Sequence, residues 1–262
     1  MNSLFKKSIL AVLAIALVAF AAGCGGSDKP SETPDAAVKS ALTKTSQITS
    51  GQADVKASLA VGSLPGSLSI TGGGPFDTKA KGGPATDLQF SVNIAGSDQT
   101  FGLVSVDGKS YLTVGDKALE QKDAQSLQPD QIADFIAGLG NNLTNVKSTG
   151  EGTYTATVDV KKMIEASKAG DNLSKLNIPG LGSGQELSKA VSTADITVTI
   201  NADGYAEVLD VDLPITTGGN QGGVRATITL SEIDQPQTIE APTNVVKDAT
   251  ELGGIGAALA NQ

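Results

Sequence analysis

Apolar and polar residues alternate with a period of two over long parts of this chain. In the clearest stretch, residues 88–94, Leu, Phe, Val and Ile alternate with Gln, Ser and Asn. Successive side chains of a β-strand point to opposite faces, so this pattern is typical of strands with one buried face. It recurs in residues 55–61, 154–158, 196–200, 209–213 and 224–230. Because an antiparallel sheet can pack one face and expose the other, the chain is predicted to be mainly β and antiparallel.

Glycine-rich turns separate these predicted strands. Asp-Gly pairs at 107–108 and 203–204 favour tight hairpins, because both turn positions can take a positive φ. We expect Gly-Gly-Gly-Pro at 72–75 to break the strand that begins at Leu68, and a short edge-like strand to follow over 76–81. We also expect a loop to hold Leu143 and Val146.

Helical periodicity is confined to a few segments. Apolar or small residues recur at i, i+3, i+4 and i+7 after Pro34, namely Val38, Ala41, Leu42 and Thr45. This spacing predicts a helix that lies with one face on the sheet. Further helices are predicted over 129–139, over 160–167 with Asp159 as N-cap, and over 185–191. Together the patterns predict an α+β chain of about ten or eleven strands with short helices.

The N-terminal segment has the features of an export signal. Lys6 and Lys7 precede an apolar run over 9–22, which is shorter than the roughly 20 residues that a membrane-spanning helix needs. Cys24, the only cysteine of the chain, follows two positions after the run. Residues 21–24, Ala-Ala-Gly-Cys, resemble a bacterial lipobox, in which the cysteine carries a diacylglyceryl group.

This resemblance implies an exported protein that is anchored through Cys24 to the extracytoplasmic face of the cell membrane. Two or more acyl chains hold a protein stably, whereas one does not. An ordinary signal peptide that leaves a free thiol at Cys24 is the alternative, although a lone cysteine has no disulfide partner to explain it. We expect a signal peptide over 1–23, a flexible tether over 24–34, one β-domain over 35–247 and a tail over 248–262.

Composition excludes several classes of function. The chain has no histidine and no tryptophan, so it lacks the imidazole of Ser-His-Asp and Cys-His enzymes and the usual ligands of zinc. It has no P-loop, dinucleotide-binding or EF-hand motif, and we expect no metal and no cofactor. With 19 basic and 28 acidic residues, its net charge of −9 disfavours nucleic acid as a partner.

Three loose motifs carry a resemblance to a known family. They are Asp-Gly-Lys-x-Tyr at 107–111, the helix capped by Asp159, and the x-Pro-x-x-Ile-x-x-Pro run that ends at Pro242. With the lipobox and the alternating strands, the chain resembles the LolA/LolB carriers and, more closely, the LppX/LprG-type lipoproteins of actinobacteria. The resemblance covers roughly residues 35–247. It implies a half-open antiparallel β-barrel whose concave face is covered by short helices.

The same resemblance implies an apolar cavity that binds, and in some members transfers, an acylated lipid or glycolipid, with an envelope transporter as a further partner. Strand parity assigns seven residues to the cavity side: Leu59, Leu88, Phe90, Val92, Ile94, Phe101 and Leu103. Ordinary core packing is the simpler explanation for each of them. Four apolar residues of the irregular segment 170–184 indicate a flap or a loop that packs on the core: Leu173, Leu176, Ile178 and Leu181.

Two other functions compete with lipid binding. One is an envelope scaffold lipoprotein with a filled core and no ligand. The other is a carboxylate enzyme, since Asp210 and Asp212 project from the same face of one predicted strand. The chain offers no tryptophan to stack sugars, and alternating aspartates are typical of the solvated face of a sheet. We therefore expect a protein that is not an enzyme.

Replacing Cys24 by Ser removes the predicted lipid acceptor. We expect Cys24→Ser to move the protein from the membrane fraction to the soluble exported fraction, because no acyl chain then holds it on the bilayer. The far-ultraviolet circular dichroism of the released protein should retain its β signature. Cell fractionation with immunoblotting checks this, and a variant that still sediments with membranes would contradict the lipoprotein interpretation.

Overall fold

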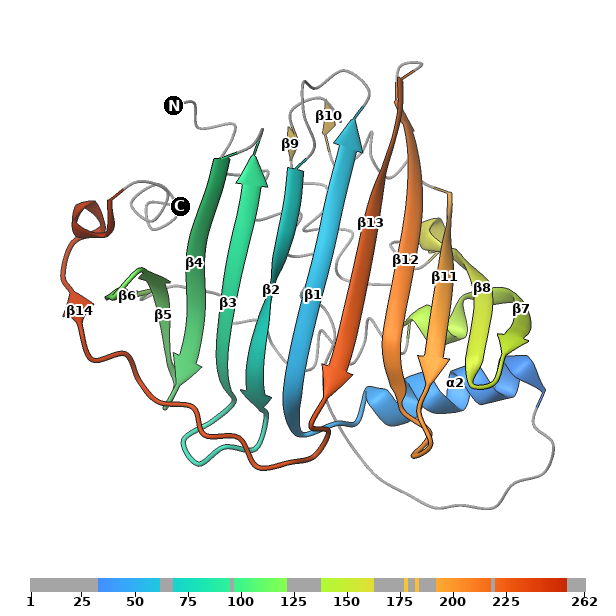
Figure 1. Ribbon diagram of the computed structural model, residues 1–262, viewed down its shortest axis with the longest axis horizontal. Helices are drawn as coiled ribbons and strands as arrows, with labels where there is room; N and C mark the ends of the chain where they lie inside the picture. Colours follow the sequence, from blue (N-terminus) through green and yellow to red (C-terminus); the bar gives the residue numbers. More distant parts are fainter. Residues whose placement is uncertain are drawn as a thin grey trace.

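The computed structural model describes residues 33–61, 68–94, 97–121, 138–162, 177–178, 182–183, 192–217 and 220–253. Within them the chain is mainly β, and twelve strands form one large sheet that is antiparallel except at one edge pair (Figure 1). The sheet ends at β14 (Val245–Val246) on one side and at β7 (Leu143–Gly150) on the other. It is therefore an open sheet in the described part of the chain, and it is not closed into a barrel.

Two antiparallel meanders build this sheet. The first contains β1 (Ser50–Val61), β2 (Leu68–Asp77), β3 (Ala85–Ile94), β4 (Ser97–Val106), β5 (Lys109–Val114) and β6 (Lys117–Glu120). The second contains β7, β8 (Thr153–Asp159), β11 (Thr193–Ile200), β12 (Ala206–Thr217) and β13 (Asn220–Ser231). Pairing of β1 with β13 joins them. A separate two-stranded sheet consists of β9 (Asn177–Ile178) and β10 (Gly182–Ser183).

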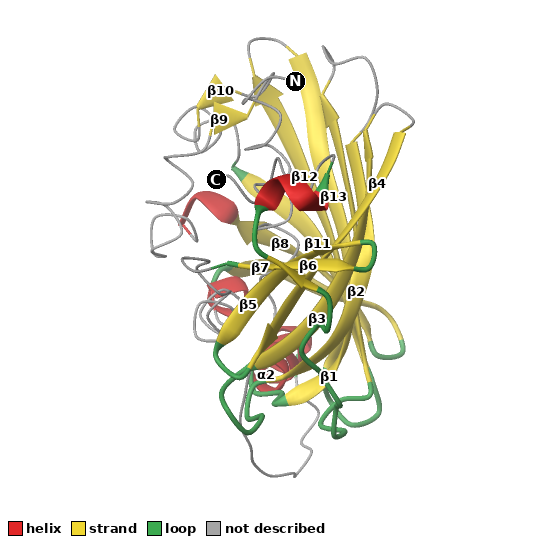
Figure 2. Ribbon diagram, turned by 90° about the vertical axis from the view of Figure 1, so that its left-hand side faces the viewer, coloured by secondary structure: helices red, strands yellow, loops and turns green. Residues whose placement is uncertain are grey.

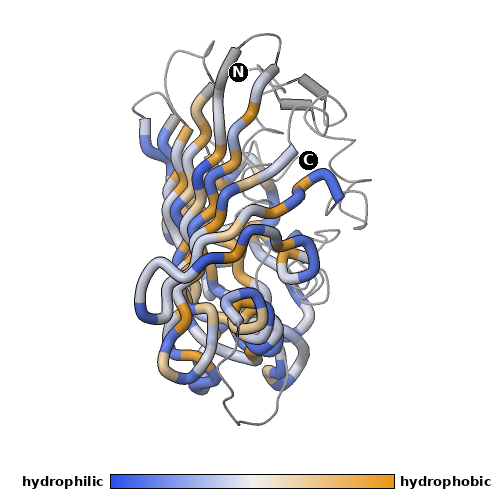
Figure 3. Tube along the Cα trace, turned by 90° about the vertical axis from the view of Figure 1, so that its right-hand side faces the viewer, coloured by the Kyte–Doolittle hydropathy of each residue, from blue (hydrophilic) through white to orange (hydrophobic). Residues whose placement is uncertain are grey.

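The alternation in the sequence matches the burial of the strands. In β1, Val55, Ala57 and Leu59 are buried, whereas Asp54 and Lys56 are exposed. Residues paired across an antiparallel sheet point to the same face, and the register matches apolar with apolar residues, such as Val55 with Ile228. Figure 3 shows this alternation of apolar and polar residues along the strands. The predicted apolar face is confirmed, and the opposite face is polar except where Val104, Val106, Tyr111 and Ala118 form a small second core.

Two predicted hairpin turns are also confirmed. Asp107 and Gly108 link β4 to β5 with φ values of 52° and 73°, the double positive φ that a tight hairpin turn of this kind requires. Gly204, with φ 82°, lies in the turn between β11 and β12. These turns bring consecutive strands into antiparallel pairs.

The predicted helix after Pro34 is confirmed as α2 (Pro34–Thr45). Thr33 is its N-cap, and its hydroxyl oxygen accepts a hydrogen bond from the N–H of Ala36 at 3.4 Å. Pro34 at the first helical position has no N–H to satisfy there. The buried stripe is the predicted one, Val38, Ala41, Leu42 and Thr45. This stripe contacts β7, β11 and β12, so α2 covers one side of the sheet at this end (Figure 2).

The prediction that residues 72–75 break a strand is wrong. β2 runs through them to Asp77 and lies between β1 and β3 rather than at an edge, and residues 78–81 form a turn and no strand. The glycines are needed because β2 passes very close to both neighbours: a Cβ on Gly73 would lie 1.9 Å from the carbonyl oxygen of Ala53. Gly74 and Pro75 are paired with no residue of β3. The N–H that Pro75 lacks is therefore not needed for the pairing of β2 with β3.

The predicted loop around Leu143 and Val146 is a strand, β7. Its pairing with β8 is irregular, and Asn145 has a φ of 55°. Register shifts of this kind interrupt the alternation of side chains between the two faces. The strand therefore carries no period-two signal, although Leu143 is buried in the main core.

The segment after β13 packs along the sheet rather than leaving it. Asp234 accepts a hydrogen bond from the N–H of Thr49 at 3.0 Å, and Ile239 packs on a second small core around Val104 and Tyr111. The segment then forms β14, which pairs in parallel with β6. The 3-10 helix η1 (Ala249–Leu252) follows, and Leu252 is buried in the main core although it lies in the predicted tail.

Gly73→Ala tests the close approach of β1 and β2. A Cβ would overlap the carbonyl of Ala53, so we expect the free energy of unfolding to fall by about 3 kcal/mol or more. Gly204→Ala is the matched control, since it also has a positive φ but nothing within 4 Å of the added Cβ. It should lose only about 1–2 kcal/mol. Urea unfolding measures both, and equal losses would contradict the steric explanation.

Candidate functional site

The seven residues predicted to line a cavity lie on one face of the sheet. Cross-strand pairs link Leu59 to Leu68 and Leu68 to Ile94, and further pairs join Phe90 to Phe101 and Leu88 to Leu103. Val92 pairs with Ile70, whose partner in β1 is Ala57, so it shares this face. We call this side of the sheet the apolar face. The register brings together residues that are up to 44 positions apart in the sequence.

Burial on the apolar face is nearly complete. Five of the seven residues belong to the main core with at most 8% of their surface exposed: Leu59, Leu88, Phe90, Val92 and Phe101. Leu103 is half-buried and packs against this core, and the side chain of Ile94 lies outside the described residues. The rings of Phe90 and Phe101 lie 5.6 Å apart, within the range of favourable aromatic pairs. Gly72 leaves room beside Phe90, since a Cβ there would lie 2.8 Å from the ring.

The helix α2 covers the other end of the apolar face. Val38 is fully buried, as are Val158 and Val198 of β8 and β11 in the same core. The hydroxyl of Thr45 accepts a hydrogen bond from the N–H of Ala206 at 2.8 Å, and this bond is buried. It ties the C-terminal turn of α2 to the start of β12. The apolar face therefore extends from β6 to β7. At the β7 end it is covered by α2, which the hydrogen bond to Ala206 holds in place.

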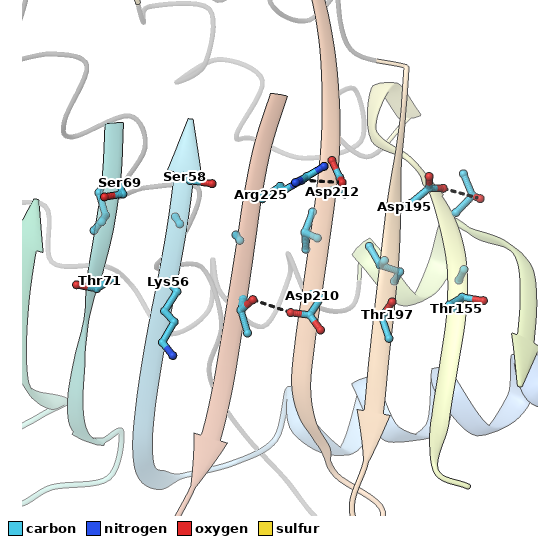
Figure 4. A pocket seen from close by; sticks show the side chains of 18 of the residues that line it. Lys56, Ser58, Ser69, Thr71, Thr155, Asp195, Thr197, Asp210, Asp212 and Arg225 are labelled. Atoms are coloured by element: carbon cyan, nitrogen blue, oxygen red, sulfur yellow. Dashed lines mark hydrogen bonds and ion pairs between the residues drawn. The ribbon is translucent and has the colours of Figure 1, made fainter. Parts of the chain in front are cut away.

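The opposite face of the sheet carries a polar groove of about 860 Å³ (Figure 4). It crosses β2, β1, β13, β12, β11, β8 and β7, and Asp210 and Asp212 lie in it, on the solvated face as expected. Asp210 accepts a hydrogen bond from the hydroxyl of Thr227 at 2.6 Å, and Asp212 pairs with Arg225 at 2.9 Å. Each carboxylate is thus held by a side chain of β13.

Sequence reasoning treated this face only as solvated and missed the groove. Its other polar side chains include Lys56, Thr71 and Thr197. Each occupies a polar position of an alternating strand, which was visible in the sequence. The signal that was missing is register, because only strand pairing places Lys56 beside Thr227 and Thr197 beside Asp210.

Several predicted site residues lie outside the described residues. Cys24 and residues 25–32 of the predicted tether do so, as do three apolar residues of the predicted flap, Leu173, Leu176 and Leu181. Thr33 and Pro34, which were also assigned to the tether, are instead the N-cap and the first residue of α2. Ile178 belongs to β9, but its side chain is not described. Residues 138–141 are helical at the end of the predicted helix 129–139, whose earlier part is outside the description, as is the predicted helix 185–191.

Asp159 caps a helical turn, as predicted. Residues 160–162 are helical, and the carboxylate of Asp159 accepts a hydrogen bond from the backbone N–H of Lys162 at 3.0 Å. This backbone hydrogen bond, followed by one from the Lys162 side chain, lowers the pKa of Asp159 below its ordinary value. At the other end of the chain, the backbone N–H and then the hydroxyl of Thr250 lower the pKa of Asp248, which caps η1. Both shifts belong to helix caps.

The described residues contain neither a membrane-spanning helix nor a cluster of metal ligands. No described helix is both long enough and apolar enough to cross a bilayer. No three His, Cys, Asp or Glu residues among those described lie close enough together to hold a metal ion.

Comparisons with known proteins leave the family of the chain open. No family model matches it, and no curated protein matches it significantly. Among solved structures, it is similar to a DUF1329 family protein from Desulfovibrio piger, at 10% sequence identity and a TM-score of 0.27. The match covers 78% of this chain and 93% of that protein. A TM-score this low carries no argument about fold or function.

Thr45→Val tests the bond that holds α2 to the sheet. The change keeps the shape of the side chain but leaves the buried N–H of Ala206 without its acceptor, so we expect a loss of about 1–3 kcal/mol of stability. Thr43→Val on the exposed side of the same helix is the control and should stay within about 0.5 kcal/mol. Urea unfolding compares the two, and an equal effect would show that the bond contributes nothing.

Proposed function

We propose that this protein is a lipid-anchored carrier on the extracytoplasmic face of the membrane, which binds the acyl chains of a lipid or glycolipid against the apolar face of its sheet. The anchor is the diacylglyceryl group of Cys24, and the residues between Cys24 and α2 link it to the domain. Binding rather than catalysis is the function, and an envelope transporter is the partner that loads or receives the lipid.

The observation that supports this proposal most is the apolar face itself. It crosses an open sheet, and alternate positions of its strands carry aliphatic or aromatic residues, such as Val92, Phe101 and Ile196. Acyl chains bind to a dry aliphatic surface, and each CH₂ group that is buried there stabilises the complex by about 0.8 kcal/mol. A sheet that is not closed can separate from its covering layer at lower free-energy cost than a closed barrel can open, because no strand pairing has to break.

The fold in this proposal is the half-open barrel of the LolA/LolB and LppX/LprG-type proteins. Three features of the described residues support it: an open sheet that is antiparallel except at one edge pair, a main core on one face of that sheet, and α2 packed on the same face. In such a fold the lipid lies between the sheet and its covering helices. The acyl chains would contact the part of the apolar face formed by β1 to β4.

A second candidate is a scaffold lipoprotein with a filled core. The burial of Phe90, Val92 and Phe101, which have at most 4% of their surface exposed, favours this alternative. The two functions differ in one measurable property, because a filled core cannot take up an acyl chain.

Lipid uptake distinguishes the two functions. The full chain, delipidated in a nonionic detergent, should increase the fluorescence of an anthroyloxy fatty acid and should carry lipid adducts in native mass spectrometry. Absence of both signals would leave the filled-core scaffold as the function.

A pair of substitutions on β4 tests whether uptake uses the apolar face. Leu103→Lys places a charge on that face, and we expect it to weaken binding of the fatty-acyl probe about tenfold or more, because an unpaired charge opposes burial beside acyl chains. Thr100→Lys changes an exposed residue on the opposite face of the same strand and should bind the probe as the wild type does. Equal binding by both variants would contradict the assignment of lipid to this face.

A further inference from the structure

The polar groove contains two straight rows of side chains that cross the strands. The first row runs in register through Thr157, Asp195, Asp212, Arg225, Ser58 and Ser69. The second row runs through Thr155, Thr197, Asp210, Thr227, Lys56 and Thr71. Figure 4 shows most of them projecting to one side of the sheet, with α2 on the other.

The rows have a regular geometry. Neighbouring strands of a sheet lie about 4.8 Å apart, so each row extends over about 24 Å, and the two rows lie about 7 Å from one another. This shape favours a long ligand with polar groups at repeated intervals over a compact one. The groove is open along its length, as the exposed side chains of Lys56, Asp210 and Arg225 indicate.

The charges of the groove are balanced. Its lining contains three cationic residues, Lys56, Lys147 and Arg225, and three carboxylates, Asp195, Asp210 and Asp212. An anionic polymer would be repelled by the three carboxylates of the groove and by the net charge of −9. A metal cation is not favoured either, because no group of carboxylates in the described residues is arranged to hold one. Charge complementarity therefore favours an uncharged ligand.

The polar groups are held in place with hydrogen-bonding capacity to spare. Thr157 donates to one oxygen of Asp195 at 3.3 Å, as Thr227 does to Asp210 and Arg225 to Asp212. Among the described residues, the second oxygen of each of these aspartates accepts no hydrogen bond. No ion pair in the described part of the chain involves Lys56. The groove thus offers fixed acceptors next to donors and to hydroxyls that can act as either.

We propose that the polar groove binds an extended, uncharged polysaccharide, whose chain lies along the two rows and across the strands. Sugar hydroxyl groups both donate and accept hydrogen bonds, which matches the mixture of hydroxyl, carboxylate and ammonium groups. The groove lining contains no aromatic side chain, so sugars are held by hydrogen bonds alone. Binding is consequently weak and insensitive to salt. This site is independent of lipid binding, because it lies on the opposite face.

Affinity electrophoresis tests this site with the full chain in a polyoxyethylene detergent that carries no sugar headgroup. The native gels contain hydroxyethylcellulose, galactomannan or pullulan as neutral probes, and polygalacturonate as the anionic probe. We expect at least one neutral polysaccharide to retard the protein equally at low and high salt, with no retardation by polygalacturonate. Retardation by none of the neutral probes, or by polygalacturonate alone, overturns the proposal.

A triple variant locates the binding in the groove. Thr197→Val, Asp210→Asn and Thr227→Val together remove hydroxyls and one charge from the second row and preserve side-chain shape and β-propensity. We expect about tenfold or greater loss of polysaccharide affinity, since each hydrogen bond contributes about 0.5–1.5 kcal/mol. Thr100→Val, on the same face but outside the groove, is the control and should bind like the wild type.

The outcomes separate the groove from the rest of the protein. Unchanged polysaccharide binding by the triple variant, or an equal loss in Thr100→Val, overturns the proposal. If the triple variant also loses uptake of the fatty-acyl probe or its circular dichroism signature, the substitutions act through the fold, and the assignment to the groove fails. Loss of polysaccharide binding with the fold and acyl uptake intact supports it. A wild-type protein that takes up no acyl probe but binds the polysaccharide removes only the lipid proposal.

Discussion

The pairing of β1 with β13 is the interaction on which the rest of the structure depends. Ten residue pairs, from Gln52 with Ser231 to Val61 with Gly222, join the two meanders into one sheet. A slip of one residue in this register would move the apolar residues of one meander to the polar face of the other. Both the continuous apolar face and the polar rows exist only because this pairing is in phase. The contacts it makes are also among the longest in sequence, which makes it slow to form.

Much of the fold was predictable because strand and helix periods are local properties of the sequence. The alternation in residues 88–94, the Asp107-Gly108 turn and the stripe that begins at Val38 each predicted the element that is observed. The errors came from residues whose role depends on neighbouring strands. Gly73 looks like a strand breaker by itself, yet it is the residue that lets β1 and β2 approach. β7 lost its alternation through an irregular register with β8, and no pattern could reveal it.

The candidate sites were predictable to different degrees for the same reason. Parity within each strand was sufficient to assign Phe90 and Phe101 to a common face, because the alternating hydrophobic residues of paired strands mostly pack on the same side. Polar residues carry no such constraint. Thr197 and Asp210 are neighbours only through the pairing of β11 with β12, and Lys56 meets Thr227 across more than 170 positions of sequence. The residues of the groove come together only through strand pairing. The groove therefore cannot be predicted until the strand order and register are known.

Both ends of this broad open sheet carry features that disfavour edge-to-edge pairing with another chain. An exposed strand edge is a template on which another chain can add a strand. At one end, β14 pairs with β6, and the N–H of Ala118 donates to the carbonyl of Asn244 at 2.9 Å, so the chain's own C-terminal segment occupies that edge. At the other end, the irregular register of β7 and the positive φ of Asn145 make the edge strand irregular, so another strand cannot pair regularly with it. Both ends of the sheet thus disfavour the edge-to-edge addition of another copy of the chain.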